Sequence, residues 1–144
     1  MLLAASYLSA GDAASAAQNY RRLLNRRPND PILLNNLAGA LHRLEDPGAA
    51  DMARRALALA PENPAIMDTL GWILAEGDGL DEGLGLLRDA HARLPDNPEV
   101  AFHLGAALLR AERRAEGEAL LRQAIDASPD SDLAAAAAAR LARH

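Results

Sequence analysis

The chain has 144 residues, with 20 acidic and 15 basic side chains, a formal charge of −5 and no cysteine. The acidic balance argues against a nucleic-acid binder, which normally carries a basic patch, and the lack of cysteine excludes disulfides and thiolate metal sites. Half of the residues are apolar but only 3% are aromatic. Most of the apolar residues are alanine and leucine, which favour helices over strands. No apolar run approaches the roughly 20 residues that span a bilayer.

A short proline-containing segment recurs four times along the chain, as "RRPNDP", "LAPENP", "RLPDNP" and "ASPDSD". The first prolines of these segments are Pro28, Pro61, Pro95 and Pro129, which are 33, 34 and 34 residues apart. A proline ends one helix, and the Asn, Asp or Ser beside it can cap the next. This period is typical of a repeated helix–turn–helix unit.

The prolines divide the chain into successive units. We predict a partial unit at 1–30, full units at 31–63, 64–97 and 98–131, and a capping helix at 132–144. Each full unit is expected to form two antiparallel helices. The sequence therefore predicts an all-α fold, an α-solenoid of about four helix pairs with a C-terminal cap.

Small residues recur at fixed positions within each unit. In the third and fourth units they include Gly71 and Gly105 in the first helix, and Gly83 and Gly117 in the second. A glycine inside a helix costs about 1 kcal/mol relative to alanine. We expect the sequence to accept this cost because a Cβ at these positions would hold the paired helices apart.

The two ends of the chain differ. Ser131 or Asp132 can cap the last helix, whose basic C-terminal turn suits the helix dipole, and this helix is expected to cover the last unit. Met1 falls several residues into the first helix of its unit. The apolar stretch "MLLAASYL" then predicts either a preceding repeat stacked on this face or a homodimer formed through it.

With leucine, small-residue and proline positions in register over four units, the sequence resembles the tetratricopeptide repeat along nearly its whole length. That resemblance implies helix pairs stacked into a right-handed superhelix, with a concave groove lined by the first helix of each pair. It also implies that the groove binds a partner protein or an extended peptide. The carboxylate-clamp variety of the family uses lysines in the groove, and this chain has no lysine, so that variety is not expected.

The first helices carry a second face beside their buried stripe, and residues at helical spacing on it are predicted to line the groove. The predicted partner-binding residues are Asn35, Asn36, Gly39, His42 and Arg43, then Asp68, Thr69, Trp72 and Glu76, then Glu99, Phe102, His103, Ala106 and Arg110. Paired amides such as Asn35 and Asn36 can hold a peptide backbone, although they also serve local roles within repeats.

Trp72, the only tryptophan of the chain, leaves two interpretations open. It occupies the position of Gly39 and Ala106 in the neighbouring units, so it can face the groove as a binding anchor. It can equally fill the gap between neighbouring first helices. His42 and His103 lie two units apart, too far to share a metal ion, and are expected to be surface or hydrogen-bonded histidines.

No catalytic constellation is present in the sequence. It contains no Gly-rich phosphate loop after a strand, no metal-ligand spacing, and no nucleophile with a base and an acid. We therefore predict a non-enzymatic scaffold without a cofactor or metal. Two alternatives remain open, a self-association module that stacks through the N-terminal unit and an accessory repeat arm of a larger enzyme.

Residues 34–108 also look like the C-terminal repeats of tetratricopeptide lipoproteins associated with exosortase and PEP-CTERM sorting in Gram-negative bacteria. The similar elements are "NNLA", the short "DP" turn, "APENPAIMDTLGWIL" and the late "HLG", whereas Gly39 stands where that family often has an aromatic residue. This resemblance implies a periplasmic or outer-membrane lipoprotein near exopolysaccharide production and protein sorting. A cytoplasmic location is the alternative.

Overall fold

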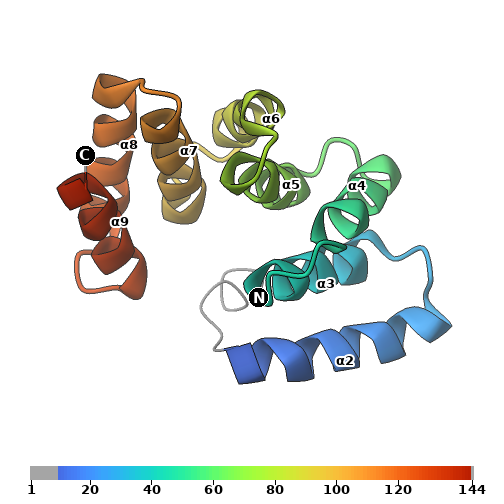
Figure 1. Cartoon of the computed structure of the whole chain (residues 1–144). Coiled ribbons are helices and arrows are strands. Elements are labelled where there is room, and N and C mark those ends of the chain that lie inside the picture. Colours follow the sequence, from blue (N-terminus) through green and yellow to red (C-terminus); the bar gives the residue numbers. More distant parts are fainter. Residues whose placement is uncertain (1–9, 144) are drawn as a thin grey trace.

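The computed structural model describes residues 10–143, and this part of the chain is helical without strands. Its helices in chain order are α2 (Ala10–Arg26), α3 (Pro31–Arg43), α4 (Ala49–Leu59), α5 (Pro64–Glu76), α6 (Leu80–Arg93), α7 (Pro98–Arg110), α8 (Arg114–Ala127) and α9 (Asp132–Arg143). Three consecutive pairs, α3–α4, α5–α6 and α7–α8, are packed side by side in an arc (Figure 1). The predicted all-α solenoid is confirmed.

The first helix of each full unit begins in the same way. Asp30, Asn63 and Asn97 each accept two backbone N–H bonds at the start of α3, α5 and α7, and a proline occupies the first turn of each helix. Helix α9 begins with a hydrogen bond of 3.0 Å from the Ala134 amide to Ser131 Oγ. The capping predicted beside each proline is therefore confirmed.

Facing glycines bring the two helices of a pair into close contact. A Cβ added to Gly83 would lie 2.6 Å from the carbonyl oxygen of Gly71, and one added to Gly117 would lie 2.8 Å from that of Gly105. Both distances are too short for real carbon–oxygen contacts, and the blocking atoms belong to the backbone. The predicted role of these glycines is confirmed.

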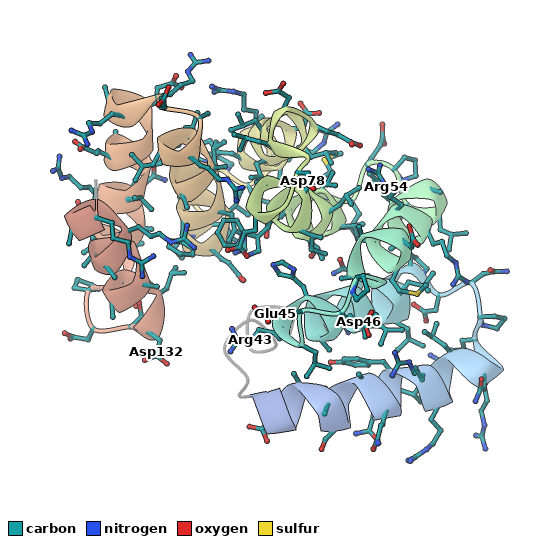
Figure 2. The ribbon with its side chains drawn as sticks, viewed as in Figure 1. Arg43, Glu45, Asp46, Arg54, Asp78 and Asp132 are labelled. Atoms are coloured by element: carbon teal, nitrogen blue, oxygen red, sulfur yellow. The ribbon has the colours of Figure 1, made fainter. Side chains whose placement is uncertain are left out.

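The arc has a distinct inner and outer side. Helices α3, α5 and α7 lie on the inner side and α4, α6 and α8 on the outer side, while α9 packs against α7 and α8 at the C-terminal end (Figure 1). Arg43 and Glu45 at the end of α3 and Asp132 at the start of α9 border the hollow of the arc (Figure 2). On the outer side, Arg54 of α4 forms two hydrogen bonds of 2.8 and 2.9 Å with Glu82 of α6.

Two sequence predictions lie outside the described residues. The N-terminal face, with Met1 and the stretch that follows it, and the terminal His144 are not covered, so stacking or dimerisation through that face stays a prediction. Within residues 10–143, no helix combines the length and hydrophobicity needed to cross a lipid bilayer.

Candidate functional site

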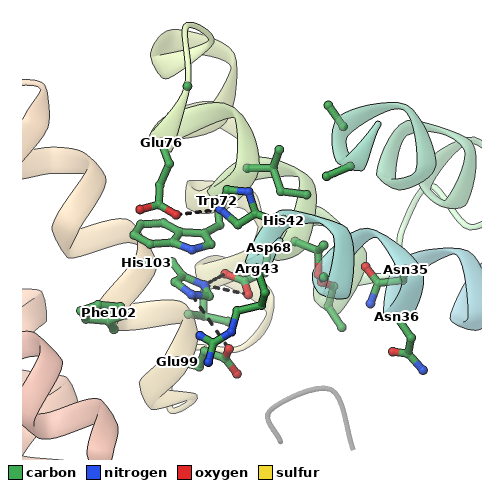
Figure 3. A pocket seen from close by; sticks show the side chains of 18 of the residues that line it. Asn35, Asn36, His42, Arg43, Asp68, Trp72, Glu76, Glu99, Phe102 and His103 are labelled. Carbon is green, nitrogen blue, oxygen red and sulfur yellow. Dashed lines mark hydrogen bonds and ion pairs between the residues drawn. The ribbon is translucent and has the colours of Figure 1, made fainter. Parts of the chain in front are cut away.

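A groove with a volume of about 1190 Å³ follows the inner side of the arc, between α3, α5, α7 and α9 (Figure 3). Its volume exceeds the roughly 300–1,000 Å³ of an ordinary small-molecule pocket. The lining contains every predicted groove residue except Ala106 and Arg110. Ala106 is only 3% exposed on the helix that α9 covers. The Arg110 guanidinium donates a hydrogen bond of 3.2 Å to the Gly77 carbonyl instead of facing the groove.

A buried ion pair joins α5 to α7 in the groove wall. His103 Nδ1 lies 2.9 Å and 3.0 Å from the two carboxylate oxygens of Asp68. On the other side of the ring, Nε2 is 3.9 Å from Glu99 Oε1. All three residues are buried, with 6 to 8% of their surface exposed.

The charges around His103 favour its protonated form. Burial alone would lower the pKa of His103, but the carboxylates of Asp68, Glu99 and Glu76 outweigh it and raise that pKa above its ordinary value. Carboxylates flank both ring nitrogens, and this arrangement favours the protonated imidazole. The pair links α5 to α7 and so orders the groove wall.

Trp72 packs against neighbouring helices and also lines the groove. Its ring stacks on His103 with centroids 4.4 Å apart and an interplanar angle of 19°, and it tilts against Phe102 at 5.8 Å. It packs against the core between α7, α8 and α9, yet it also lines the groove and is half-buried. Trp72 is thus a structural element of the wall whose free edge faces the groove.

A second polar cluster connects three helices across the groove. Glu76 of α5 accepts a hydrogen bond of 2.7 Å from His42 Nε2 of α3 and one of 3.3 Å from Arg140 of α9. Partial burial alone would raise the pKa of Glu76, but the hydrogen bond from His42 and the charge of Arg140 outweigh it and lower that pKa. The carboxylate is therefore held ionised beside the His42 ring and the Arg140 guanidinium.

Arg140 lines the groove but was not among the predicted groove residues, because the basic end of α9 was attributed to the helix dipole. The guanidinium lies 5.5 Å from the Trp72 ring centroid and 6.0 Å from that of Phe102. A signal was present, since Leu133, Ala137 and Arg140 are spaced four and three residues apart and so share one face of the helix. Leu133 and Ala137 belong to the core with α7 and α8, and this places Arg140 in the groove.

Two neighbouring asparagines on α3 have buried side-chain atoms without a partner among the described residues. Asn35 is 1% exposed, and neither its Nδ2 nor its Oδ1 has a hydrogen-bond partner among the described residues; Asn36 Oδ1 is in the same state. Leaving a buried polar group unsatisfied costs about 1–3 kcal/mol. Both residues line the groove, so the wall carries unused hydrogen-bonding capacity.

The comparison with known proteins agrees with this geometry. Two family models described as tetratricopeptide repeats match residues 74–141 and 1–30. The chain folds as a tetratricopeptide repeat solenoid. Among curated proteins, none matches the sequence significantly.

Several solved tetratricopeptide repeat structures are similar to this chain. YrrB, described as "a TPR protein with an unusual peptide-binding site", is 25% identical, with a TM-score of 0.68 over 88% of this chain and 66% of its own. TTC0263 from Thermus thermophilus is 24% identical, with a TM-score of 0.73 over 92% and 74% of the two chains. MamA from Desulfovibrio magneticus RS-1 is 21% identical, with a TM-score of 0.69 over 92% and 84%. The chain thus spans just under two thirds of YrrB.

The lining of this tetratricopeptide groove is acidic. Its carboxylates outnumber its guanidinium groups by six to two; they are Glu45, Asp46, Asp68, Glu76, Glu99 and Asp132, against Arg43 and Arg140. Counting both His42 and His103 as charged still leaves an excess of negative charge. Over residues 10–143, no group of three or more His, Cys, Asp or Glu side chains is arranged to hold a metal ion.

The His103 pair predicts a pH dependence of stability. A group whose pKa is raised on folding stabilises the fold fully below its unfolded pKa, about 6.5 for histidine, and loses this effect as the pH rises through the folded value. We therefore expect the free energy of unfolding to decline above about pH 6.5, with a limiting slope of about 1.4 kcal/mol per pH unit. Urea unfolding at a series of pH values measures this.

The His103→Gln variant is expected to lose that decline, because the carboxylates of Asp68 on α5 and Glu99 on α7 then face no titrating ring. His91→Gln, which removes a histidine from the outer helix α6, is the matched control and should keep the wild-type profile. Identical profiles for wild type and His103→Gln would contradict the assignment.

Proposed function

We propose that the chain is a non-enzymatic scaffold that binds a partner protein by holding an extended segment of it in the groove. The observation that carries this proposal is a set of buried atoms without a partner among the described residues, Nδ2 and Oδ1 of Asn35 and Oδ1 of Asn36. The same groove is also lined by Trp72. An extended main chain offers the alternating donors and acceptors that such amides need. The likeness to YrrB, a protein described as having a peptide-binding site, supports the same proposal.

Gly39 offers a clean way to block the groove. An added Cβ there would meet no described atom within 4 Å, and the residue lines the groove. A longer side chain at this position would therefore enter the groove without disturbing the helix pair. Gly85 on the outer helix α6 is equally unobstructed and exposed, so the same substitution there is a matched control.

We expect random peptides displayed on phage and selected on the immobilised wild-type chain to bind Gly39→Gln about tenfold more weakly, a loss of about 1.4 kcal/mol. Gly85→Gln should bind them like the wild type. Synthetic copies of the selected peptides can be titrated by following the emission of Trp72. Equal affinities for Gly39→Gln and wild type would show that peptides bind elsewhere, and failure to select any peptide would contradict the proposal.

The resemblance over residues 34–108 gives a context for this function, and we propose that the scaffold acts in the bacterial envelope, in protein sorting or exopolysaccharide export. The support is the set of short elements shared with that family. Co-sedimentation of the full-length protein with the envelope fraction of its source tests the context separately from peptide binding.

A further inference from the structure

Arg140 occupies the groove as a ligand side chain would. It comes from α9, 64 residues beyond Glu76 in the sequence, yet its Nη2 lies 3.3 Å from Glu76 Oε2. The same guanidinium is 5.5 Å from the ring centroid of Trp72 and 6.0 Å from that of Phe102. A planar cation beside aromatic rings and a carboxylate is the arrangement that favours arginine over lysine. Trp72, Phe102 and Glu76 form a wall of the groove (Figure 3), which we call the cation wall. This wall already holds the Arg140 guanidinium.

We propose that the cation wall receives an arginine side chain of the partner segment, and that Arg140 occupies this place in the unliganded chain. The inference rests on the proposed function, since it specifies the chemistry of the segment that the groove would hold. It commits to a cationic segment and assigns Arg140 the role of an internal competitor.

The charge of the groove supports a cationic ligand. Six carboxylates line it against two arginines, and Arg140 is itself one of those two. If a partner displaced Arg140, the remaining lining would be more negative still, with Glu76 facing only His42. An acidic segment would meet like charges along most of the groove, and such juxtapositions disfavour binding.

The contact made by Arg140 is suited to exchange. Its side chain is 29% exposed and that of Glu76 is 33% exposed, and partly exposed ion pairs of this kind contribute little to stability. The contact beneath Trp72 is different from that of Arg140. Trp72 stacks on His103, which is paired with Asp68 and has a side chain only 8% exposed. Arg140 can therefore leave while the aromatic surface keeps its position.

The unsatisfied amide of Asn35 is an independent indication of a ligand. It is 1% exposed, lines the same groove from α3 and has no partner among residues 10–143. Neither the cation wall nor the acidic lining accounts for it. A segment with its arginine on the cation wall would run its main chain toward α3. There its N–H and C=O groups would meet the amide of Asn35, which has no other partner among the described residues.

The first test uses the peptides selected on the wild-type chain. We expect them to be enriched in arginine over the unselected library. Replacing that arginine by citrulline, its neutral isostere, should weaken binding by about tenfold, as followed by Trp72 emission. Added salt should weaken the arginine peptide more than the citrulline peptide, because ionic contacts are screened.

The second test changes the internal competitor. Arg140→Ala should bind the arginine peptide about three- to tenfold more tightly than the wild type, because the place on the cation wall is vacant. Arg143→Ala removes the same charge from the exposed side of α9 and should bind like the wild type. Glu76→Gln should weaken the arginine peptide and leave the citrulline peptide unchanged.

The outcomes separate this inference from the proposed function. Peptides that are blocked by Gly39→Gln but are rich in Asp or Glu, or that tolerate citrulline, would overturn the cation wall and leave groove binding intact. Weaker binding by Arg140→Ala would also overturn it, since Arg140 would then be a contact for the ligand. Loss of all groove binding would remove both proposals.

Discussion

Replacing Asp68 by alanine is expected to lower the free energy of unfolding by about 3 kcal/mol, the usual cost of removing one partner from a buried ion pair. Asp68 accepts hydrogen bonds of 2.9 and 3.0 Å from His103, and both residues are buried. Without the carboxylate, His103 must either keep a poorly compensated buried charge or give up its proton. For a chain of this size, the loss corresponds to a fall in melting temperature of roughly 10 °C.

Asp89→Ala is the matched control, because it removes the same carboxylate from the exposed face of α6 and should change stability by no more than about 0.5 kcal/mol. The double variant Asp68→Asn/His103→Gln should be more stable than Asp68→Ala, since two neutral amides can hydrogen bond without burying a charge. Chemical unfolding followed by circular dichroism measures all three. An Asp68→Ala variant as stable as Asp89→Ala would show that the pair contributes nothing.

The solenoid could be predicted from the sequence because its rules are local and repeat. Each proline is followed by a capping Asp, Asn or Ser, and these caps are seen at Asp30, Asn63 and Asn97. The facing glycines follow from the same period, since a close approach needs a small residue on both helices. Neither inference required knowledge of how distant segments pack.

The groove residues could be predicted as positions but not as pairs. Helical spacing placed Asp68 and Trp72 of α5, and His103 of α7, on the groove faces of their helices. The Asp68–His103 ion pair and the stack of Trp72 on His103 depend in addition on side-chain orientation. One rule can be read in retrospect. His42 and Glu76 are 34 residues apart and Asp68 and His103 are 35 apart, so residues about one period apart on first helices meet in neighbouring units.

The C-terminal end of the groove could not be predicted in this way because α9 has no partner helix of its own. Its position is set by packing of Leu133 and Ala137 against α7 and α8. That packing explains why Ala106 is covered and why Arg140 reaches Glu76. A terminal helix breaks the period, and with it the argument from equivalent positions.

A second large effect is expected for Gly83→Ala, which should lower the free energy of unfolding by about 2 kcal/mol. The added Cβ would lie 2.6 Å from the Gly71 carbonyl oxygen and 2.8 Å from the Ala75 amide nitrogen. Both are backbone atoms, so α5 and α6 must separate, and overpacking of this kind costs about 1–3 kcal/mol even after repacking. Thermal and urea unfolding measure the loss.

Gly85→Ala provides the control two residues further along the same helix. Its Cβ would meet no described atom within 4 Å, so this variant should gain about 0.5–1 kcal/mol from helix propensity and the reduced entropy of the unfolded chain. Gly83→Ala gains the same helix propensity and the same reduction in unfolded-chain entropy. The difference in the free energy of unfolding between the two variants therefore isolates the close approach of α5 and α6. Equal stabilities would mean that the helices can move apart without loss.

The same pair of variants tests whether the helix contact positions the groove. Trp72 directly follows Gly71 on α5, and as the only tryptophan it reports on this helix alone. If Gly83→Ala pushes α5 away from α6, the stack of Trp72 on His103 must shift, and the emission of the folded variant should differ from that of the wild type. Gly85→Ala should keep the wild-type emission. A destabilised Gly83→Ala with unchanged emission would place the displacement on α6 and leave the groove wall intact.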